Sequence, residues 1–214
     1  MSTPTPADPL RRGLLVIWPN LPVLLVASIV TGAAWACTRA AGPLAPVSAV
    51  LCGLPTLAGL SGGCVELLRG TQYTVRMFFG RLPAVCWLSL KLLWPALVAG
   101  SLAEAAAVAH AATGHILWLV SLGLSATTAV VLGAAGVVAL FHAVATGQTS
   151  ARASLIAVAP WFTTCRTQVL TVSSALVVAT LLSPHLAFAM LVLLPIPTAM
   201  AVAVAVVSAD ERSR

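Results

Sequence analysis

The sequence predicts an all-α fold, a polytopic transmembrane helical bundle with about six spans that forms a single domain over residues 1–214. Hydrophobic residues make up 60% of the chain and charged residues only 7%, and the mean hydropathy is +1.04. A soluble domain averages about 25% charged residues, so lipid is expected to be the solvent of most of this chain. Crossing a bilayer core takes about 20 apolar residues of helix. Six apolar stretches approach or exceed that length, at residues 14–36, 47–68, 85–109, 116–146, 169–182 and 186–207.

The basic residues predict the orientation of these spans. If six spans alternate, one side of the membrane receives nine arginines, namely Arg11, Arg12, Arg69, Arg76, Arg81, Arg152, Arg166, Arg212 and Arg214. The other side receives Arg39 alone, and Lys91 lies inside the third span. Cytoplasmic loops carry the excess of Lys and Arg, so a multi-pass protein of the cell membrane with both termini in the cytoplasm is predicted.

Net charge and cysteine content also limit the classes of partner and cofactor that are expected. The net charge of +6 is what orientation and anionic headgroups require, so the expected partner is the lipid bilayer and no nucleic acid is expected. The five cysteines are dispersed and form no CxxC pair, so neither a metal site nor a cofactor is predicted.

The first span carries the sequence Trp18-Pro19-Asn20-Leu21-Pro22 near its cytoplasmic end. Two prolines remove helix donors, which predicts a bend or a late start. Asn20 is a candidate binding residue, with a capping or interhelical hydrogen bond as the simpler interpretation.

The second span is rich in small residues. Gly59 and Gly63 share a helix face, and this spacing predicts a close helix–helix contact. Pro55 predicts a kink in the outer third of the span. Glu66 and Arg69 are spaced to form an ion pair at the end of the helix.

The third span holds two charged candidates for a binding site, Lys91 and Glu104. They are 13 residues apart, or roughly 20 Å along a straight helix, so they cannot pair with each other. Lys91 either snorkels toward the cytoplasmic headgroups or serves a binding pathway. Glu104 is predicted near the outer interface, where a solvated or interhelical role is the simpler interpretation.

The fourth span and the connections around the later spans show further patterns. The fourth span, at 116–146, is too long for a perpendicular crossing and must tilt or emerge. The connections 71–81 and 149–166 mix apolar and basic residues, and both are predicted to lie on the cytoplasmic leaflet as anchors or docking surfaces. A tight outer turn at 183–185 joins the last two spans, and Pro195 and Pro197 are predicted to interrupt the sixth.

No catalytic residues are predicted. The chain lacks HExxH, GxSxG, P-loop and dinucleotide-binding patterns. Glu66 and Glu104, the only carboxylates outside the tails, are expected at opposite membrane faces. A nucleophile and its base need to be within hydrogen-bond reach, so an intramembrane enzyme is the least favoured interpretation.

Four short motifs carry a resemblance to a known family. They are Asn20-Leu21 in the first span, Gly53-Leu54-Pro55 in the second, the basic aromatic stretch 73–81, and Leu155 to Pro160 ahead of the fifth span. In this order they resemble the YesL-type family of bacterial integral membrane proteins. That family is of similar length and span number and is associated with sugar ABC-transport systems. The resemblance implies an accessory role in solute uptake and assigns no binding residues.

Two functions are therefore expected ahead of catalysis. The first is a transport-associated membrane protein, either an accessory subunit or a small permease-like component, with transporter subunits as possible partners. Kinked helices, buried polar residues and a basic cytoplasmic face favour it. The alternative is a structural or assembly scaffold that binds a membrane-protein partner through the Gly59/Gly63 face.

Overall fold

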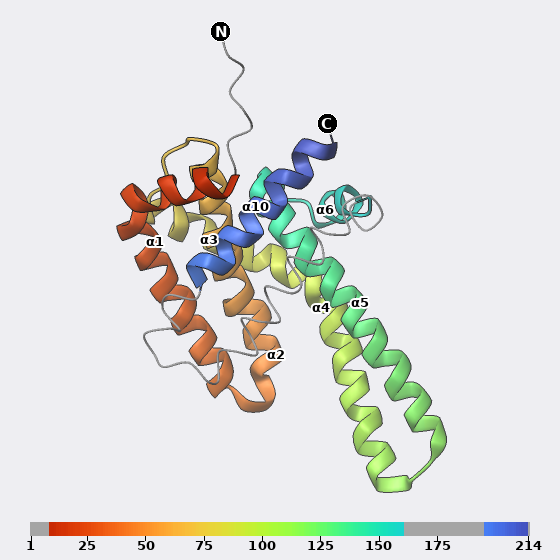
Figure 1. The fold of residues 1–214 in the computed structure, drawn as a ribbon. Coiled ribbons are helices and arrows are strands. Elements are labelled where there is room, and N and C mark those ends of the chain that lie inside the picture. The colour runs from red at the N-terminus through yellow and green to blue at the C-terminus, as the bar shows by residue number, and fades with distance from the viewer. Residues whose placement is uncertain (1–8, 161–194, 214) are drawn as a thin grey trace.

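The chain is helical almost throughout the part that the structure describes. The computed structural model describes residues 9–160 and 195–213, and that part contains no strand. The main helices are α1 (Pro9–Ala40), α3 (Leu54–Leu68), α4 (Val75–Thr113), α5 (Ile116–Thr146), α6 (Ala151–Val158) and α10 (Pro195–Ser213). The all-α class is thereby confirmed (Figure 1).

Four of the described helical stretches are long and apolar enough to cross a membrane: Trp18–Ala40, Gly42–Leu68, Val75–Thr113 and Ile116–Thr146. They correspond to the first four predicted spans. The predicted span 169–182 and residues 186–194 of the sixth lie outside the described residues. The chain is therefore a membrane protein by the character of its helices.

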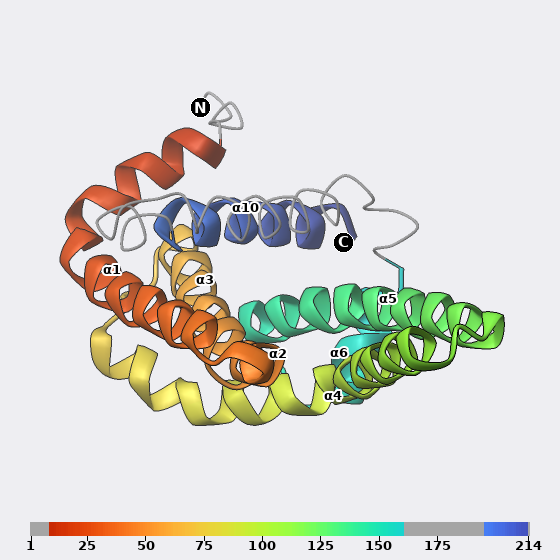
Figure 2. The same ribbon diagram turned by 90° about the horizontal axis from the view of Figure 1, so that it is seen from below.

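Helix α1 continues through the Pro19/Pro22 region where a bend or late start was predicted. Pro19 and Pro22 lie inside the helix, and Figures 1 and 2 show a change of direction between its first turns and the remainder. A proline removes an intrahelical bond and kinks a helix without ending it when neighbouring groups compensate.

The second span is assembled from four consecutive pieces without a gap. A 3-10 turn at Gly42–Leu44 leads into α2 (Ala45–Ser48), a π-helical turn at Ala49–Gly53 and then α3. In a π-turn the carbonyl of Val50 would accept from the amide five residues on, but that residue is Pro55, which has no N–H. The Ser89 hydroxyl of α4 donates to this carbonyl at 2.7 Å. A kink was predicted at Pro55. The helix instead accommodates this proline through a π-turn and a hydrogen bond from α4.

Helix α4 differs from the prediction because it begins ten residues before the expected span. Thr74 caps it, with its hydroxyl accepting from the Met77 amide at 3.3 Å. Most of the segment predicted to lie on the leaflet as a separate anchor is therefore the first part of α4. At 1.5 Å per residue, 39 residues give about 58 Å, well beyond a hydrocarbon core of about 30 Å. Figures 1 and 2 show that its first half crosses the bundle and its second half follows α5.

The core lies where α1, α3, α10, the first half of α4 and the last half of α5 meet. Its largest fully buried side chains include Leu24, Leu60, Phe78, Phe141 and Val202. Beyond it, the second half of α4 and the first half of α5 extend as a hairpin, away from the other described helices (Figure 1). Helices α4 and α5 therefore each contribute one half to the core and the other half to the extended hairpin.

Helix α10 packs across α3 and α1 and contributes buried Val202 and Ala203 to the core. It begins at Pro195, where an interruption of the sixth span was predicted. Both Pro195 and Pro197 therefore lie in its first turn, where a missing N–H costs little.

Candidate functional site

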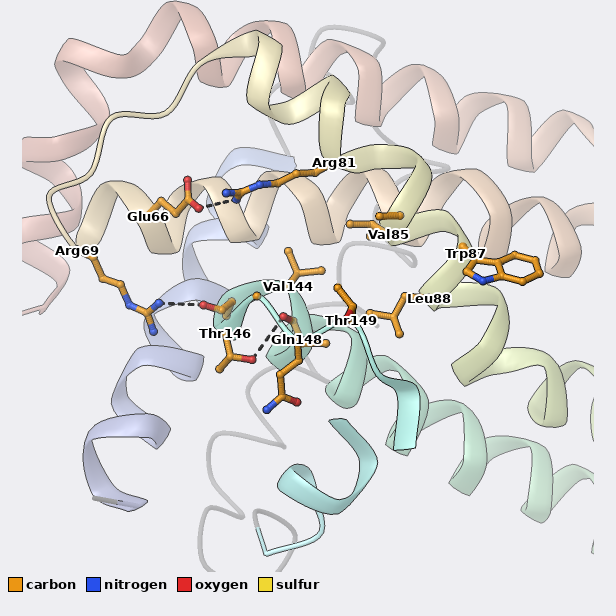
Figure 3. A pocket seen from close by; sticks show the side chains of 14 residues that line it. Glu66, Arg69, Arg81, Val85, Trp87, Leu88, Val144, Thr146, Gln148 and Thr149 are labelled. Carbon is orange, nitrogen blue, oxygen red and sulfur yellow. Dashed lines mark hydrogen bonds and ion pairs between the residues drawn. The ribbon is translucent and has the colours of Figure 1, made fainter. Parts of the chain in front are cut away.

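A cavity of about 520 Å³ lies where the end of α3, the first part of α4 and the end of α5 meet (Figure 3). Its apolar wall comes mainly from α4 and α5 and includes Val85, Leu88 and Val144. Its polar lining consists of Glu66, Arg69, Arg81, Thr146, Gln148 and Thr149. Such a concave site, mostly apolar with a few polar groups, is typical of small-molecule binding.

The end of α3 places the first two charged groups. The helix ends at Leu68, and the amide of Arg69 closes onto the carbonyls of Val65 and Glu66. Gly70 then adopts a positive φ of 81°, and the Thr71 hydroxyl donates to the Glu66 carbonyl at 2.7 Å. This tight reversal holds Glu66 and Arg69 at the cavity and sends the chain back toward α4.

Glu66 forms an ion pair with Arg81, whereas the sequence analysis predicted a pair with Arg69. The Nη1 atom of Arg81 lies 2.5 Å from Oε1 of Glu66. The reason is the early start of α4, which brings Arg81 alongside the end of α3. The second carboxylate oxygen, Oε2, is buried and has no hydrogen-bond partner within the described residues. A buried acceptor without a donor is unfavourable, and this atom has almost no surface open to the cavity.

Arg69 joins the end of α3 to the end of α5. Its Nη1 donates to the Ala145 carbonyl at 2.9 Å, and Ala145 lies in the last turn of α5. Gly147 follows with a φ of 74°, and the amide of Gln148 donates to the Ala143 carbonyl at 2.9 Å. This is the hydrogen-bond pattern of a Schellman C-cap. A cation at this position also interacts favourably with the helix dipole.

The face of Gly59 and Gly63 packs against residues of the same chain beside the cavity. A Cβ added at Gly63 would lie 2.3 Å from the ring of Tyr73, and one added at Gly59 would lie 3.3 Å from Phe78. The Tyr73 hydroxyl donates to the Gly59 carbonyl at 3.1 Å. Burial is the main cause that raises the pKa of the Tyr73 phenol. The close contact at this face therefore involves an aromatic ring from the connection as well as helix α4.

The three residues singled out from sequence as binding candidates are not brought together. Asn20 is half-buried on α1, Lys91 is exposed on α4, and Glu104 is exposed on the far half of α4. The ammonium of Lys91 lies 5.0 Å from the centre of the Trp87 ring. A cation at this distance over an indole is attracted by the ring. None of the three candidates lines the cavity.

Sequence reasoning missed Arg69, Arg81 and Gln148 as site residues. Arg69 was considered as an ion-pair partner of Glu66 and Arg81 as part of a basic aromatic stretch, and Gln148 was treated as part of a connection. The available signal was the position of polar and charged residues at the ends of three consecutive spans, where alternation places them on one side of the membrane. No group of three or more His, Cys, Asp or Glu residues suited to a metal ion occurs in residues 9–160 and 195–213.

Comparison with known proteins gives no match to a family model, a curated protein or a solved structure. The similarity to YesL-type proteins therefore stays an expectation from four short motifs. The function has to be argued from the cavity itself.

Proposed function

We propose that this chain is a transport-associated protein of the cell membrane, an accessory or permease-like component of a solute uptake system with both termini in the cytoplasm. The observation that carries the proposal is the cavity, which gathers Glu66, Arg69 and Arg81 in an otherwise apolar bundle. Ionisable side chains inside a membrane-spanning bundle commonly pair with one another or mark a substrate or ion pathway. A chain that only filled space in the bilayer would not need them in one concavity.

The position of the cavity supports a role at the cytoplasmic face. Arg81 precedes the apolar stretch that begins at Val85, and Thr146 ends the stretch that begins at Ile116. The cavity is therefore at the level where hydrocarbon gives way to headgroups. With the predicted orientation, this level is on the cytoplasmic side.

A role as a structural or assembly scaffold is less favoured. Its docking surface was the face of Gly59 and Gly63, and Tyr73, Phe78 and Leu82 of this chain occupy that face. A partner helix could reach it only by displacing the connection between α3 and α4. We therefore favour ligand binding over scaffolding.

Uptake in cells tests the proposal. A strain lacking the gene is complemented with the wild-type chain, with Arg81→Gln or with Glu104→Gln, and uptake of a panel of labelled sugars and organic anions is measured. We expect at least one solute whose uptake rate falls several-fold without the gene, is restored by wild type and Glu104→Gln, and is not restored by Arg81→Gln. Membrane levels of all three chains are compared by immunoblot.

Equal uptake of every solute with and without the gene, together with purification of the chain free of transporter subunits, would contradict the proposal. Equal rescue by Arg81→Gln and wild type would show that the cavity is not the site.

A further inference from the structure

The outer face of α4 carries the only lysine of the chain, Lys91. Lys91 is exposed, and its ammonium lies 5.0 Å from the centre of the Trp87 ring. Trp87 and Trp94 are exposed as well. Residues three and four apart on a helix are neighbours on its surface, so the two tryptophans lie one turn before and one turn after Lys91 on the same face. The three side chains form an uncovered patch in the part of the chain that the structure describes.

The ammonium of Lys91 lies toward the same end of the apolar stretch as the cavity. Lys91 follows six residues after Val85, where that stretch begins, or about 9 Å along the helix. Helical side chains lean toward the N-terminus, and the contact with Trp87 shows that the lysine stem runs in this direction. Trp87 lines the cavity, and Figure 3 shows its indole pointing away from the other lining side chains. Lys91 therefore reaches back toward the level at which we place the headgroups.

The charge of Lys91 is not balanced within the described residues, where it makes no hydrogen bond or ion pair. Glu66 pairs with Arg81, and Glu104 lies 13 residues farther along α4. The indole face attracts the ammonium but carries no net charge. A lysine inside a span pairs with an anionic group or reaches the interface, so this site requires an anion from outside the described part of the chain.

A second copy of the chain does not fit this face. Two copies in one membrane share the same orientation, so their twofold axis runs along the membrane normal, and a residue at the centre of the contact meets its own counterpart. The ammonium of Lys91 would then face that of the other copy, and two like charges in a poorly hydrated contact repel each other. The anion therefore has to come from a different molecule.

The surface beyond Lys91 is suited to an acyl chain. Trp94, Val98 and Leu102 follow at intervals of four residues, and all three are exposed. Residues at this spacing form a continuous apolar strip along one side of the helix. Tryptophan is enriched at the boundary between hydrocarbon and headgroups. A phospholipid supplies both complementary parts, a phosphate at the level of the headgroups and acyl chains in the hydrocarbon.

We infer that Lys91 and Trp87 form a binding site on the outer face of α4 for the phosphate of an anionic phospholipid. The ammonium donates to the phosphate oxygens, the Trp87 ring holds the ammonium in place, and an acyl chain lies along the strip that begins at Trp94. A zwitterionic headgroup brings its own cation to the phosphate, so an anionic lipid is favoured. Lys91 does not line the cavity, and the inference therefore does not depend on the transport proposal.

Chemical protection of Lys91 tests the inference directly, because the chain has no other lysine. The protein is placed in nanodiscs of phosphatidylcholine alone or mixed with phosphatidylglycerol of identical acyl chains, and acetylation by a membrane-permeant ester is followed by peptide mass spectrometry. We expect phosphatidylglycerol to slow acetylation of Lys91 about fivefold, in line with one hydrogen bond to a charged group. Arg152→Lys adds an exposed reference amine on α6, which should be slowed less than about twofold. Equal slowing at both amines, or none at Lys91, would overturn the inference.

Lipid binding measured by native mass spectrometry gives a second readout. Lys91→Gln should remove most of the preference for phosphatidylglycerol over phosphatidylcholine at the tightest site, whereas Lys91→Arg and the control Arg152→Gln should keep it. The same preference in all of these chains would contradict the site. Protection is measured on the native lysine, so it stays decisive if Lys91→Gln does not fold. Protection that is equal in both lipids and requires a co-purified protein would assign a protein carboxylate to this face and overturn the lipid.

Discussion

Near the cavity, α5 meets α4 with Gly136 against the Leu92 backbone, whereas toward the Gly114 turn the same helices meet through alanines. A Cβ added at Gly136 would lie 2.9 Å from the Leu92 carbonyl oxygen, and one added at Gly123 would meet nothing within 4 Å. Ala99, Ala103 and Ala106 are the buried residues of the far half of α4. Small residues let helices approach closely in lipid, where the hydrophobic effect does not hold them together.

The hydrogen bonds and ion pairs of polar side chains also differ between the region near the cavity and the far hairpin. The near end holds the Glu66–Arg81 pair, the Arg69–Ala145 bond and the buried Ser89–Val50 bond. In the far hairpin, Thr127 and Thr128 bond to carbonyls of their own helix, and the outer faces expose large apolar side chains. Tertiary hydrogen bonds are therefore concentrated at the near end, whereas the two helices of the far hairpin pack on each other and expose apolar outer faces suited to lipid contact.

Replacing Gly63 by leucine should give the largest loss of stability. The new side chain would overlap the Tyr73 ring, and overpacking of this kind costs about 3 kcal/mol or prevents folding. Gly100→Leu is the control, because nothing lies within 4 Å of its added Cβ. Thermal unfolding in detergent should show a large drop for Gly63→Leu and little change for Gly100→Leu. Equal melting temperatures would mean that the Tyr73 contact does not exist.

Alanine substitutions on α5 should have opposite effects at the two ends. Gly136→Ala places a methyl against the Leu92 backbone, which cannot move like a flexible side chain, and should cost about 2 kcal/mol. Gly123→Ala has open space and should stabilise the helix by up to about 1 kcal/mol. Denaturant titrations in one detergent measure both. A destabilising Gly123→Ala would show that the far hairpin is packed as tightly as the near end.

Removing the Ser89 hydroxyl should cost about 1–2 kcal/mol, because the Val50 carbonyl would lose its donor in a buried site. Ser101→Ala on the same helix is matched to it, since the Ser101 hydroxyl is exposed and bonds to its own helix. We expect Ser101→Ala to be close to neutral in the same unfolding assay. A neutral Ser89→Ala would show that the π-turn needs no interhelical bond.

Titration of Tyr73 should have the smallest effect on stability. It can be followed directly by absorbance, because Tyr73 is the only tyrosine in the chain. Burial raises its pKa, so tyrosinate absorbance should be absent in the folded protein at pH 11 and appear on denaturation, where the phenol titrates near 10. A folded pKa above the unfolded one stabilises fully below pH 10. By pH 11 the folded state has lost about 1 kcal/mol of stability relative to neutral pH, because the unfolded phenol ionises there and the buried phenol does not. Normal titration of the folded protein near pH 10 would contradict the buried position of Tyr73.

The fold class and the presence of four long apolar helices in the first two thirds of the chain could be predicted because hydropathy acts along the chain and needs no tertiary information. The pairing of Glu66 was mispredicted because proximity in sequence favoured Arg69, and the actual partner depends on how the chain returns into α4. The early start of α4 was missed because the basic aromatic residues before Val85 are equally typical of an interfacial segment. The cavity itself is a tertiary property, since its lining comes from three helices.

The side of the membrane on which the cavity opens is the most direct test of the account. With the native cysteines replaced by alanine, single cysteines at Thr149, beside the cavity, and at Ala112, near the hairpin turn, are exposed to a membrane-impermeant maleimide. Both positions are exposed in the structure. We expect Ala112→Cys to be labelled on intact cells and Thr149→Cys to be labelled only after permeabilisation. Labelling of Thr149→Cys on intact cells would place the cavity outside the cytoplasm and contradict the account.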